Sequence, residues 1–345
     1  MNEQNEKMEL TPLAAETDKN PSQPLETGKM ELTIFTEKVD RLRNAISAVI
    51  VGQERAVDLI LAAILAHGHV LLEGVPGVAK TLLAKMIAKL IDANFSRIQF
   101  TPDLMPSDVL GTSVFNMKTS EFNFHPGPVF ADLVLVDEVN RAPAKTQSAL
   151  FEVMEERQAT IDGICHPMSE IYTILATQNP IEQEGTYKLP EAQLDRFMMK
   201  ITIPYPSLQE EIEILERHNQ NAKLPKLHNI EPVITREELL EMFGYVEKVF
   251  IEKSLLHYIA SVIQQTRNSK AVFLGASPRA SVALLQSSKA MALLQGREFV
   301  TPEDIKAVAP FVLQHRLILT AEAEMEGHTS LKVIQRLIEK VEVPK

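Results

Sequence analysis

Cysteine occurs once in this sequence of 345 residues, at Cys165. A single cysteine cannot form an intrachain disulfide, so nothing in the sequence indicates an oxidising compartment. The sequence also has no early segment of positive charge followed by apolar residues, and no run of 18 apolar residues. These absences argue against secretion and against a membrane-spanning helix, and we expect a cytoplasmic protein.

The sequence also has no excess of basic residues over acidic ones. The 35 Lys and Arg residues are outnumbered by 46 Asp and Glu residues, which gives a formal net charge of −11. Binding to nucleic acid without sequence preference needs a basic surface, so this balance argues against it, although an acidic protein can still carry a local basic groove. The apolar fraction of 45% is enough for a sizeable core, and the length predicts two or three domains.

The beginning of the chain differs in composition from the rest. Residues 1–29 contain five Glu, three Pro and no Val, Ile or Phe, which is too few apolar groups to offset the entropy of ordering. We therefore expect a disordered tail over residues 1–31. A sheet-containing domain is expected over residues 32–223 and a helical domain over residues 224–345, with the proline-bounded segment Leu224–Pro232 as the hinge.

The segment His69–Thr81 carries the first signal of function. Its apolar run Val70–Leu72 is typical of a buried parallel strand, and a loop with two glycines then leads into an expected helix. Backbone N–H groups of such a loop and helix start point at an anion, Lys80 would reach the β- and γ-phosphates, and the Thr81 hydroxyl would bind Mg²⁺. Ala79 stands where the general phosphate-loop pattern has its second glycine, so the loop does not decide the matter by itself.

Two carboxylates follow a second apolar run. Leu133–Val136 leads directly into Asp137 and Glu138, which places both acids at the carboxyl end of a buried strand, where open α/β sheets bind ligands. Asp137 would hold Mg²⁺, and Glu138 would orient and deprotonate the attacking water. Strands that alternate with helices predict a parallel, doubly wound sheet. The expected strands are Val70–Leu72, Ser96–Phe100, Leu133–Val136, Ile171–Ala176 and Met198–Ile203.

Three further polar residues have a functional and a structural interpretation. Asn179 follows an expected strand and can hold a water or a phosphate oxygen, but an Asn before a proline also commonly forms a turn. Arg196 precedes the last expected strand, where a lone arginine is often a surface charge. Arg279 lies in the first turn of an expected helix, where a cation is unfavourable unless an anion or an acid lies opposite.

Turn and capping residues predict the remaining elements. Two β-hairpins are expected at Ser113–Phe124 and at Gln158–Met168, the second around an Asp-Gly turn. Past Pro206 the strand signals stop, and capping boxes begin several helices. The expected helices are 36–49, 54–65, 82–91, 143–156, 189–197, 207–219, 236–250, 252–268, 278–295 and 302–315.

Together these pieces resemble the MoxR family of AAA+ ATPases. Five motifs in order carry the resemblance, which spans about Leu32 to Leu319: Gly-Val-Pro-Gly-Val-Ala-Lys-Thr, Leu-Val-Asp-Glu-Val-Asn-Arg-Ala-Pro, Ala-Thr-Gln-Asn-Pro, Leu-Pro-Glu-Ala-Gln-Leu-Asp-Arg-Phe and Gly-Ala-Ser-Pro-Arg. The resemblance implies an α/β fold, with an αβα core around a five-stranded parallel sheet, β-hairpin insertions and a following all-helical lid. It also implies ATP and Mg²⁺, with ATP bound between core and lid.

The same resemblance implies a role for each candidate residue. Lys80 and Thr81 are similar to the Walker A pair, and Asp137 and Glu138 to the Walker B pair. Asn179 is similar to sensor 1, Arg196 to the arginine finger and Arg279 to sensor 2. The residues expected to bind the nucleotide are Val51, Gly52, Gln53, Gly74, Val75, Pro76, Gly77, Val78, Ala79, Lys80, Thr81 and Leu82.

Three functions remain open from the sequence. The first is a ring-forming ATPase, of six subunits by the resemblance, that remodels or activates a partner protein, which in this family often bears a von Willebrand factor A domain. The second is a nucleic-acid motor, which the scarcity of Lys and Arg in both hairpins disfavours. The third is a nucleotide-gated scaffold without useful turnover, against which Glu138, Asn179 and Arg196 argue.

Overall fold

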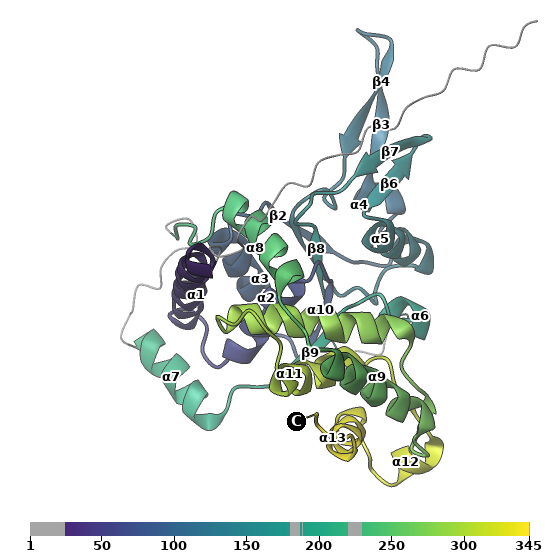
Figure 1. Cartoon of the computed structure of the whole chain (residues 1–345). Coiled ribbons are helices and arrows are strands. Elements are labelled where there is room, and N and C mark those ends of the chain that lie inside the picture. Colours follow the sequence, from purple (N-terminus) through teal and green to yellow (C-terminus); the bar gives the residue numbers. More distant parts are fainter. Residues whose placement is uncertain (1–24, 180–186, 188, 220–229, 345) are drawn as a thin grey trace, which may run out of the picture.

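A parallel sheet of five strands forms the centre of the protein, in a computed structural model that describes residues 25–179, 187, 189–219 and 230–344. Figure 1 shows how the other elements surround this sheet. The strand order is β2-β5-β8-β1-β9, and every neighbouring pair is parallel, as predicted. The strands are β1 (Val70–Gly74), β2 (Phe95–Gln99), β5 (Leu133–Asp137), β8 (Thr173–Gln178) and β9 (Met199–Ile203).

Alternation along the strands divides the core into two layers. Val70 and Leu72 of β1 pack in one cluster, and Leu71 between them packs in the other, because successive side chains point to opposite faces. The first layer holds α1 (Leu25–Ser47), α2 (Glu54–Leu65) and α3 (Lys80–Leu90). The second holds α4 (Pro106–Leu110) and α5 (Ala144–Glu156), and the short helix α6 (Glu191–Leu194) packs beside it. This arrangement confirms the αβα core.

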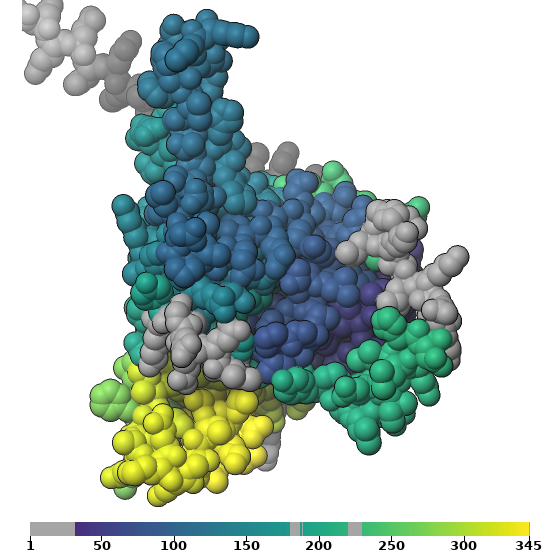
Figure 2. Space-filling model, turned by 180° about the vertical axis from the view of Figure 1, so that it is seen from behind, coloured from purple at the N-terminus to yellow at the C-terminus, as the bar shows by residue number. Residues whose placement is uncertain are grey.

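Both predicted hairpins are present and project from one side of the core as a single arm (Figures 1 and 2). Strands β3 (Gly111–Asn116) and β4 (Glu121–Pro126) form the first, and β6 (Gln158–Ile161) and β7 (Ile164–Pro167) the second. Asp162 and Gly163 both have positive φ, of 51° and 80°, as a two-residue hairpin turn requires.

The C-terminal part is mostly helical, and it follows α7 (Leu208–Asn219). It also contains a two-stranded antiparallel sheet of β10 (Val272–Leu274) and β11 (Ile318–Leu319), which the expectation of an all-helical lid did not include. These strands are too short to show a pattern in the sequence, and they pair across a long stretch of chain. The helices are α8 (Arg236–Lys248), α9 (Lys253–Asn268), α10 (Pro278–Leu294), α11 (Pro302–Leu313), α12 (Ala321–Met325) and α13 (Ser330–Lys340).

The described residues of the lid share one hydrophobic core with the helices that cover the sheet. One cluster of buried side chains runs from α1 and α2 into α10 and α13, so the lid packs directly on the helices that cover the sheet. Buried Leu61 of α2 and buried Leu284 of α10 belong to this same cluster. The lid is therefore fixed against its own core by apolar contact.

The expected N-terminal tail and the expected hinge both lie partly outside the described residues. Helix α1 begins at Leu25, so it includes the last seven residues of the segment 1–31 that was expected to be a tail. Residues 25–31 include Leu, Glu, Lys and Met, which are good helix formers and continue the following helix. Residues 1–24, and most of the expected hinge Leu224–Pro232, lie outside the described residues. Among the helices that the structure describes, none has the length and apolar character needed to cross a bilayer.

Candidate nucleotide-binding site

The phosphate loop connects the end of β1 to the start of α3 at Lys80. Gly77 has φ of 88°, and Ala79, the residue before the helix, is left-handed with φ of 59° and ψ of 22°. This backbone explains why the general pattern has glycine at the second position, because an L-residue pays roughly 1–2 kcal/mol there. The loop thus keeps the geometry of a phosphate loop even though Ala79 replaces glycine.

The side chain of Lys80 turns back to the end of the strand. Its Nζ donates a hydrogen bond to the carbonyl of Gly74 and another, at 3.3 Å, to that of Val75. The ammonium group is therefore held at the mouth of the loop, next to the first turn of α3, where backbone N–H groups are unpaired within the helix. This set of donors fits a bound triphosphate, and Thr81 is the second residue of the same helix.

A cavity of about 480 Å³ opens beside this loop. Gln53 Nε2 donates to the carbonyl of Val78 at 2.7 Å, while Gln53 Oε1 is buried and accepts no hydrogen bond. A largely apolar pocket with a buried, unpaired amide oxygen suits a base that carries an amino group. Its lining comes from the residues before α2, the phosphate loop, the end of β9 and α7: Val49, Ile50, Val51, Gly52, Gln53, Pro76, Gly77, Val78, Ala79, Leu82, Ile203, Pro204, Tyr205, Pro206, Glu210, Glu211 and Ile214.

Glycine suits position 52 at the rim of this cavity. Its φ is 73°, and a Cβ at this position would lie 2.1 Å from Oε1 of Glu210 on α7. Any other residue would therefore strain the backbone and displace the Glu210 carboxylate. The two walls of the cavity meet at this point.

Asp137 ends β5 in a network of three side chains. The Thr177 hydroxyl donates to Asp137 Oδ1 at 3.1 Å and accepts from the Glu138 N–H at 3.0 Å, while Arg97 Nε donates to Asp137 Oδ2 at 2.6 Å. Asp137 is buried, with 6% of its surface exposed. Sequence reasoning missed Thr177 and Arg97. Their one signal was position, since both lie on strands adjacent to β5.

Glu138 adopts a strained backbone at the next position, with φ of 58°. Its Oε2 accepts a hydrogen bond from Gln99 Nε2 at 2.9 Å and lies 3.1 Å from Arg141 Nε. A non-glycine residue in the left-handed region costs roughly 1–3 kcal/mol and is common at functional sites. The sequence analysis did not predict the contacts of Glu138 with Gln99 and Arg141.

Asn179 follows β8, the strand between β5 and β1, and is buried with 8% of its surface exposed. The carboxyl ends of neighbouring parallel strands meet at one edge of the sheet. This edge brings together the phosphate loop, the two acids and Asn179. The Asp137 carboxylate and the Thr81 hydroxyl are the oxygen ligands expected for Mg²⁺ at this edge. They suit Mg²⁺, which commonly takes few protein ligands together with substrate phosphates. Among the described residues no group of three or more His, Cys, Asp and Glu could hold a metal on its own.

Arg196 and Arg279 lie elsewhere. Both contact Glu155 at the end of α5, Arg196 through Nε at 3.0 Å from Oε2, and Arg279 at the other carboxylate oxygen. They line a second cavity of about 610 Å³ that includes His69, the residue before β1. Since β1 has five residues at about 3.3 Å each, this cavity lies about 16 Å from the phosphate loop, at the opposite edge of the sheet.

The position of Arg279 corrects the expectation that ATP lies between core and lid. The described residues that line the cavity at the phosphate loop all precede α8, and Arg279 faces the other edge. The reason is the packing of α10 on α2, which carries the start of α10 away from the loop. Arg279 is therefore placed beside Arg196 and not beside Lys80 of the same chain.

Buried groups around the second cavity have shifted pKa values. Burial, with a smaller effect of the Arg157 charge, lowers the pKa of His69 to about 4. The neutral ring accepts from the Ile174 N–H at Nδ1, at 2.9 Å, and donates from Nε2 to the Met154 carbonyl at 3.0 Å. Burial also lowers the pKa of Arg316, against the opposing effect of Asp195. Apart from Glu155 and Asp195, the charged residues lining this cavity are arginines.

Residues 69–199 match the family described as ATPases associated with various cellular activities (AAA), and residues 264–337 match the AAA lid domain. The chain is 43% identical to chaperone MoxR1 of Mycobacterium tuberculosis, over 92% of this chain and 85% of that protein. It is 47% identical to the uncharacterized protein YeaC of Bacillus subtilis, over 87% of this chain and 92% of that one. Protein MoxR of Methylorubrum extorquens is 30% identical, over 87% of this chain and 93% of that one.

A solved structure also resembles the fold. The crystal structure of a proposed ATPase from Cytophaga hutchinsonii has a TM-score of 0.85 and 41% sequence identity, and covers 93% of this chain and 99% of that chain. Sequence and fold therefore lead to the same family.

Proposed function

The chain belongs to the MoxR family of AAA+ ATPases, and from this premise we propose that it hydrolyses ATP in a ring of identical subunits and uses the cycle to remodel or activate a partner protein. One observation carries the proposal. The phosphate loop, Glu138 and Asn179 share one edge of the sheet, whereas Arg196 and Arg279 share the opposite edge. Each chain therefore carries both halves of a phosphoryl-transfer site, on separate faces.

Within one subunit, the residues of the first edge bind ATP and activate water. Lys80 and the N–H groups at the start of α3 hold the β- and γ-phosphates, and Thr81 and Asp137 hold Mg²⁺. Mg²⁺ held by these two residues would neutralise charge on the β- and γ-phosphates. Glu138 accepts a proton from the attacking water once its carboxylate leaves Gln99 and Arg141, and Asn179 orients that water.

The second edge completes the site of a neighbouring copy. The guanidinium groups of Arg196 and Arg279 stabilise negative charge that develops on the γ-phosphate, an effect worth roughly 10³–10⁵ in rate for an arginine supplied in this way. Contact between opposite faces of identical chains is head-to-tail, and such contacts form a closed ring when the rotation between subunits divides a full turn. We propose six subunits, as in the resemblance.

The hairpin arm supports a protein partner. Val114, Phe115, Met117 and Phe122 are exposed on it, with 89% of Met117 and 72% of Phe122 accessible. In the first hairpin Lys118 is the only Lys or Arg, and the second, Gln158–Met168, has none. An exposed apolar surface on the first hairpin, with a single cation beside it, favours a protein partner over nucleic acid, which would need several cations. We propose that the partner carries a von Willebrand factor A domain and that the protein is cytoplasmic.

Mixing two inactive variants tests the shared site. Lys80→Ala subunits keep both arginines, and Arg196→Ala subunits keep the phosphate loop, so each is inactive alone and a mixed ring contains complete interfaces. We expect ATPase activity to return on mixing, and to rise with protein concentration in the wild type. If the subunits demonstrably exchange and ATPase activity still does not return, the shared site is contradicted. Titrating wild-type subunits into each variant shows whether a ring needs several adjacent active sites.

The two other functions give different results. A nucleic-acid motor would show ATPase activity that rises several-fold with added DNA or RNA. A scaffold would bind ATP with no turnover at any protein concentration. Capture of a client by Glu138→Gln, which should hold ATP and the closed ring, would identify the partner protein.

A further inference from the structure

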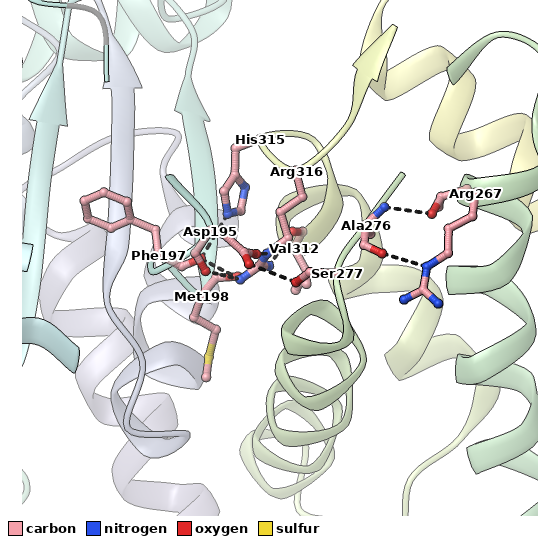
Figure 3. A network of polar contacts seen from close by, with 10 residues as sticks. Asp195, Phe197, Met198, Arg267, Ala276, Ser277, Val312, His315 and Arg316 are labelled. Atoms are coloured by element: carbon pink, nitrogen blue, oxygen red, sulfur yellow. Dashed lines mark hydrogen bonds and ion pairs between the residues drawn. The ribbon is translucent and has the colours of Figure 1, made fainter. Parts of the chain in front are cut away.

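A buried ion pair joins the lid to the core directly beside Arg196. Arg316, at the end of the lid segment that follows α11, binds Asp195, the residue before Arg196 (Figure 3). The Arg316 Nε donates to Asp195 Oδ1 at 2.6 Å, and only 3% of the Arg316 side chain is exposed. This contact spans 121 residues of chain.

The Arg316 guanidinium has no unused donor. Besides the bond to Asp195 Oδ1, NH1 donates to the carbonyls of Met198 at 3.1 Å and Val312 at 2.6 Å, and NH2 to those of Asp195 at 3.1 Å and Phe197 at 2.8 Å. Five N–H groups thus make five bonds, which is all that an arginine can make. Three of the carbonyls belong to Asp195, Phe197 and Met198, so the backbone on both sides of Arg196 is held.

The second oxygen of Asp195 is held from the helix that carries Arg279. Ser277 Oγ donates to Asp195 Oδ2 at 2.8 Å, and Ser277 is the residue before the first turn of α10. Its hydroxyl makes no cap bond to that helix, because it is directed at Asp195 instead. The Asp195 carboxylate therefore connects the backbone of Arg196 to the start of the helix that presents Arg279.

Neighbouring contacts fix both ends of this connection. On the lid side, the Ala276 N–H donates to Thr266 Oγ1 at 3.0 Å and its carbonyl accepts from Arg267 Nε at 2.9 Å. On the core side, His315 Nε2 donates to the Phe197 carbonyl at 2.9 Å. Burial lowers the pKa of His315 well below its usual value, so the ring is neutral.

We propose that Asp195, Arg316 and Ser277 form a clamp that sets Arg196 and Arg279 at a fixed separation, so that both reach the same γ-phosphate of the neighbouring copy. The inference rests on the proposed function. All three are positioning residues and do not touch the nucleotide. Glu155 holds the two guanidinium groups together in the single chain. When both turn to a neighbour's phosphate they lose that anion, and the clamp then keeps their backbones in place, because a displacement of about 1 Å can cost roughly 10²-fold in rate.

Ser277 offers the mildest test. Ser277→Ala removes the bond to Asp195 without removing a helix cap, so we expect kcat to fall about tenfold, with KM for ATP and the thermal midpoint nearly unchanged. Ser277→Thr keeps the hydroxyl and should restore most of kcat. Asp195→Asn, which leaves Arg316 without its anion, should lower kcat by roughly 10²-fold.

A second Arg–Asp pair in the lid supplies the matched control. Arg297 NH1 donates to Asp304 Oδ2 at 2.8 Å, and 2% of the Asp304 side chain is exposed. Asp304→Asn breaks an Arg–Asp pair that contacts neither Asp195 nor Arg316, and it also weakens the bonds from Thr301 to the Asp304 carboxylate at the start of α11. It should lower the thermal midpoint at least as much as Asp195→Asn does while keeping kcat within about twofold. Equal losses of kcat in the two variants would mean that the clamp acts only through stability, and would overturn the inference.

Mixing variants shows which of the two subunits at an interface must carry Asp195. A purely structural role of Asp195 would not give such a difference. Asp195→Asn subunits keep their own phosphate loop and present displaced arginines, so adding Lys80→Ala subunits, which present intact arginines, should restore activity. Adding the double variant Lys80→Ala/Asp195→Asn should restore none. Equal results from the two mixtures overturn the clamp.

The mixture of Lys80→Ala with Arg196→Ala separates the two proposals. If that mixture recovers activity and the two Asp195→Asn mixtures give equal activity, the shared site stands and the clamp is wrong. If neither mixture recovers although subunits exchange, both proposals fail together.

Discussion

Arg196 Nε lies 3.0 Å from Glu155 Oε2, and the same carboxylate also binds Arg279. Glu155 thus supplies the anion that two neighbouring cations need when no phosphate is near them. A neighbour's triphosphate has to compete with it for both guanidinium groups.

Replacing Glu155 by Gln should therefore strengthen assembly in ATP. The side chains are about one-third to one-half exposed, so each ion pair contributes on the order of 0.2–1 kcal/mol, and we expect the protein concentration for half-maximal ATPase activity to fall about threefold. ATPase activity measured against protein concentration at two salt concentrations tests this. A rise in that concentration would mean that Glu155 orients the arginines and does not compete for them.

Glu138→Gln should bind ATP with wild-type affinity and hydrolyse it at least about 10²-fold more slowly, because the acid–base group is removed while its hydrogen-bonding shape is kept. Lys80→Ala should lose affinity instead, since the cation at the phosphate loop is gone. Equilibrium binding and phosphate release measured for both variants separate the two effects. Hydrolysis by Glu138→Gln at the parent rate would remove Glu138 from its role.

Ala79→Gly should stabilise the protein by about 1 kcal/mol, because glycine adopts the left-handed backbone at this position without the steric cost of a Cβ. Denaturant unfolding without nucleotide measures the change. Lys85→Gly, in the interior of the same helix, is the control and should cost about 1 kcal/mol. Destabilisation by both glycines would show that the loop backbone is not strained at Ala79.

Gly52→Ala should damage nucleotide binding. A Cβ at Gly52 would overlap the Glu210 carboxylate and would also strain a backbone with positive φ. We expect KM for ATP to rise, with a fall in the unfolding midpoint similar to that of Gly163→Ala, because both substitutions place a Cβ at positive φ. Gly163→Ala is the control: it has the same sign of φ, with open space around it, and lies in the hairpin turn away from the cavity. Equal KM values for the two variants would contradict the close approach.

Stability should fall as the pH drops from about 6.5 to about 4. The folded pKa of His69 is lowered to about 4 by burial, so in this window the unfolded chain binds a proton that the folded protein does not. One such histidine contributes up to about 3 kcal/mol, and His315 acts in the same direction. Thermal unfolding at several pH values should show a smaller slope in His69→Gln than in the wild type. An unchanged slope would indicate that His69 is protonated in the folded state.

The sequence by itself determined the features that depend on residues close together in the chain. The phosphate loop follows from an apolar strand, glycines and Lys80 within a short segment, and the second hairpin from Asp162 and Gly163. The capping box at Thr235 hydrogen-bonds as its spacing predicts, because both partners lie within one helical turn. At Thr301 one half of the box forms, in which the Thr301 N–H donates to Asp304. The five parallel strands and their common edge followed from apolar runs that alternate with helices.

Only the tertiary structure decided where the lid residues lie. Whether Arg279 approaches its own phosphate loop or the opposite edge depends on which face of α2 receives α10, and many small apolar contacts set that packing. Residues far apart in the chain are likewise joined by the pairing of β10 with β11, by the ion pairs of Glu155 and by the ion pair between Arg316 and Asp195. A local pattern can show that a residue is an arginine at a helix start, but the partner of that arginine is fixed only when distant segments pack together.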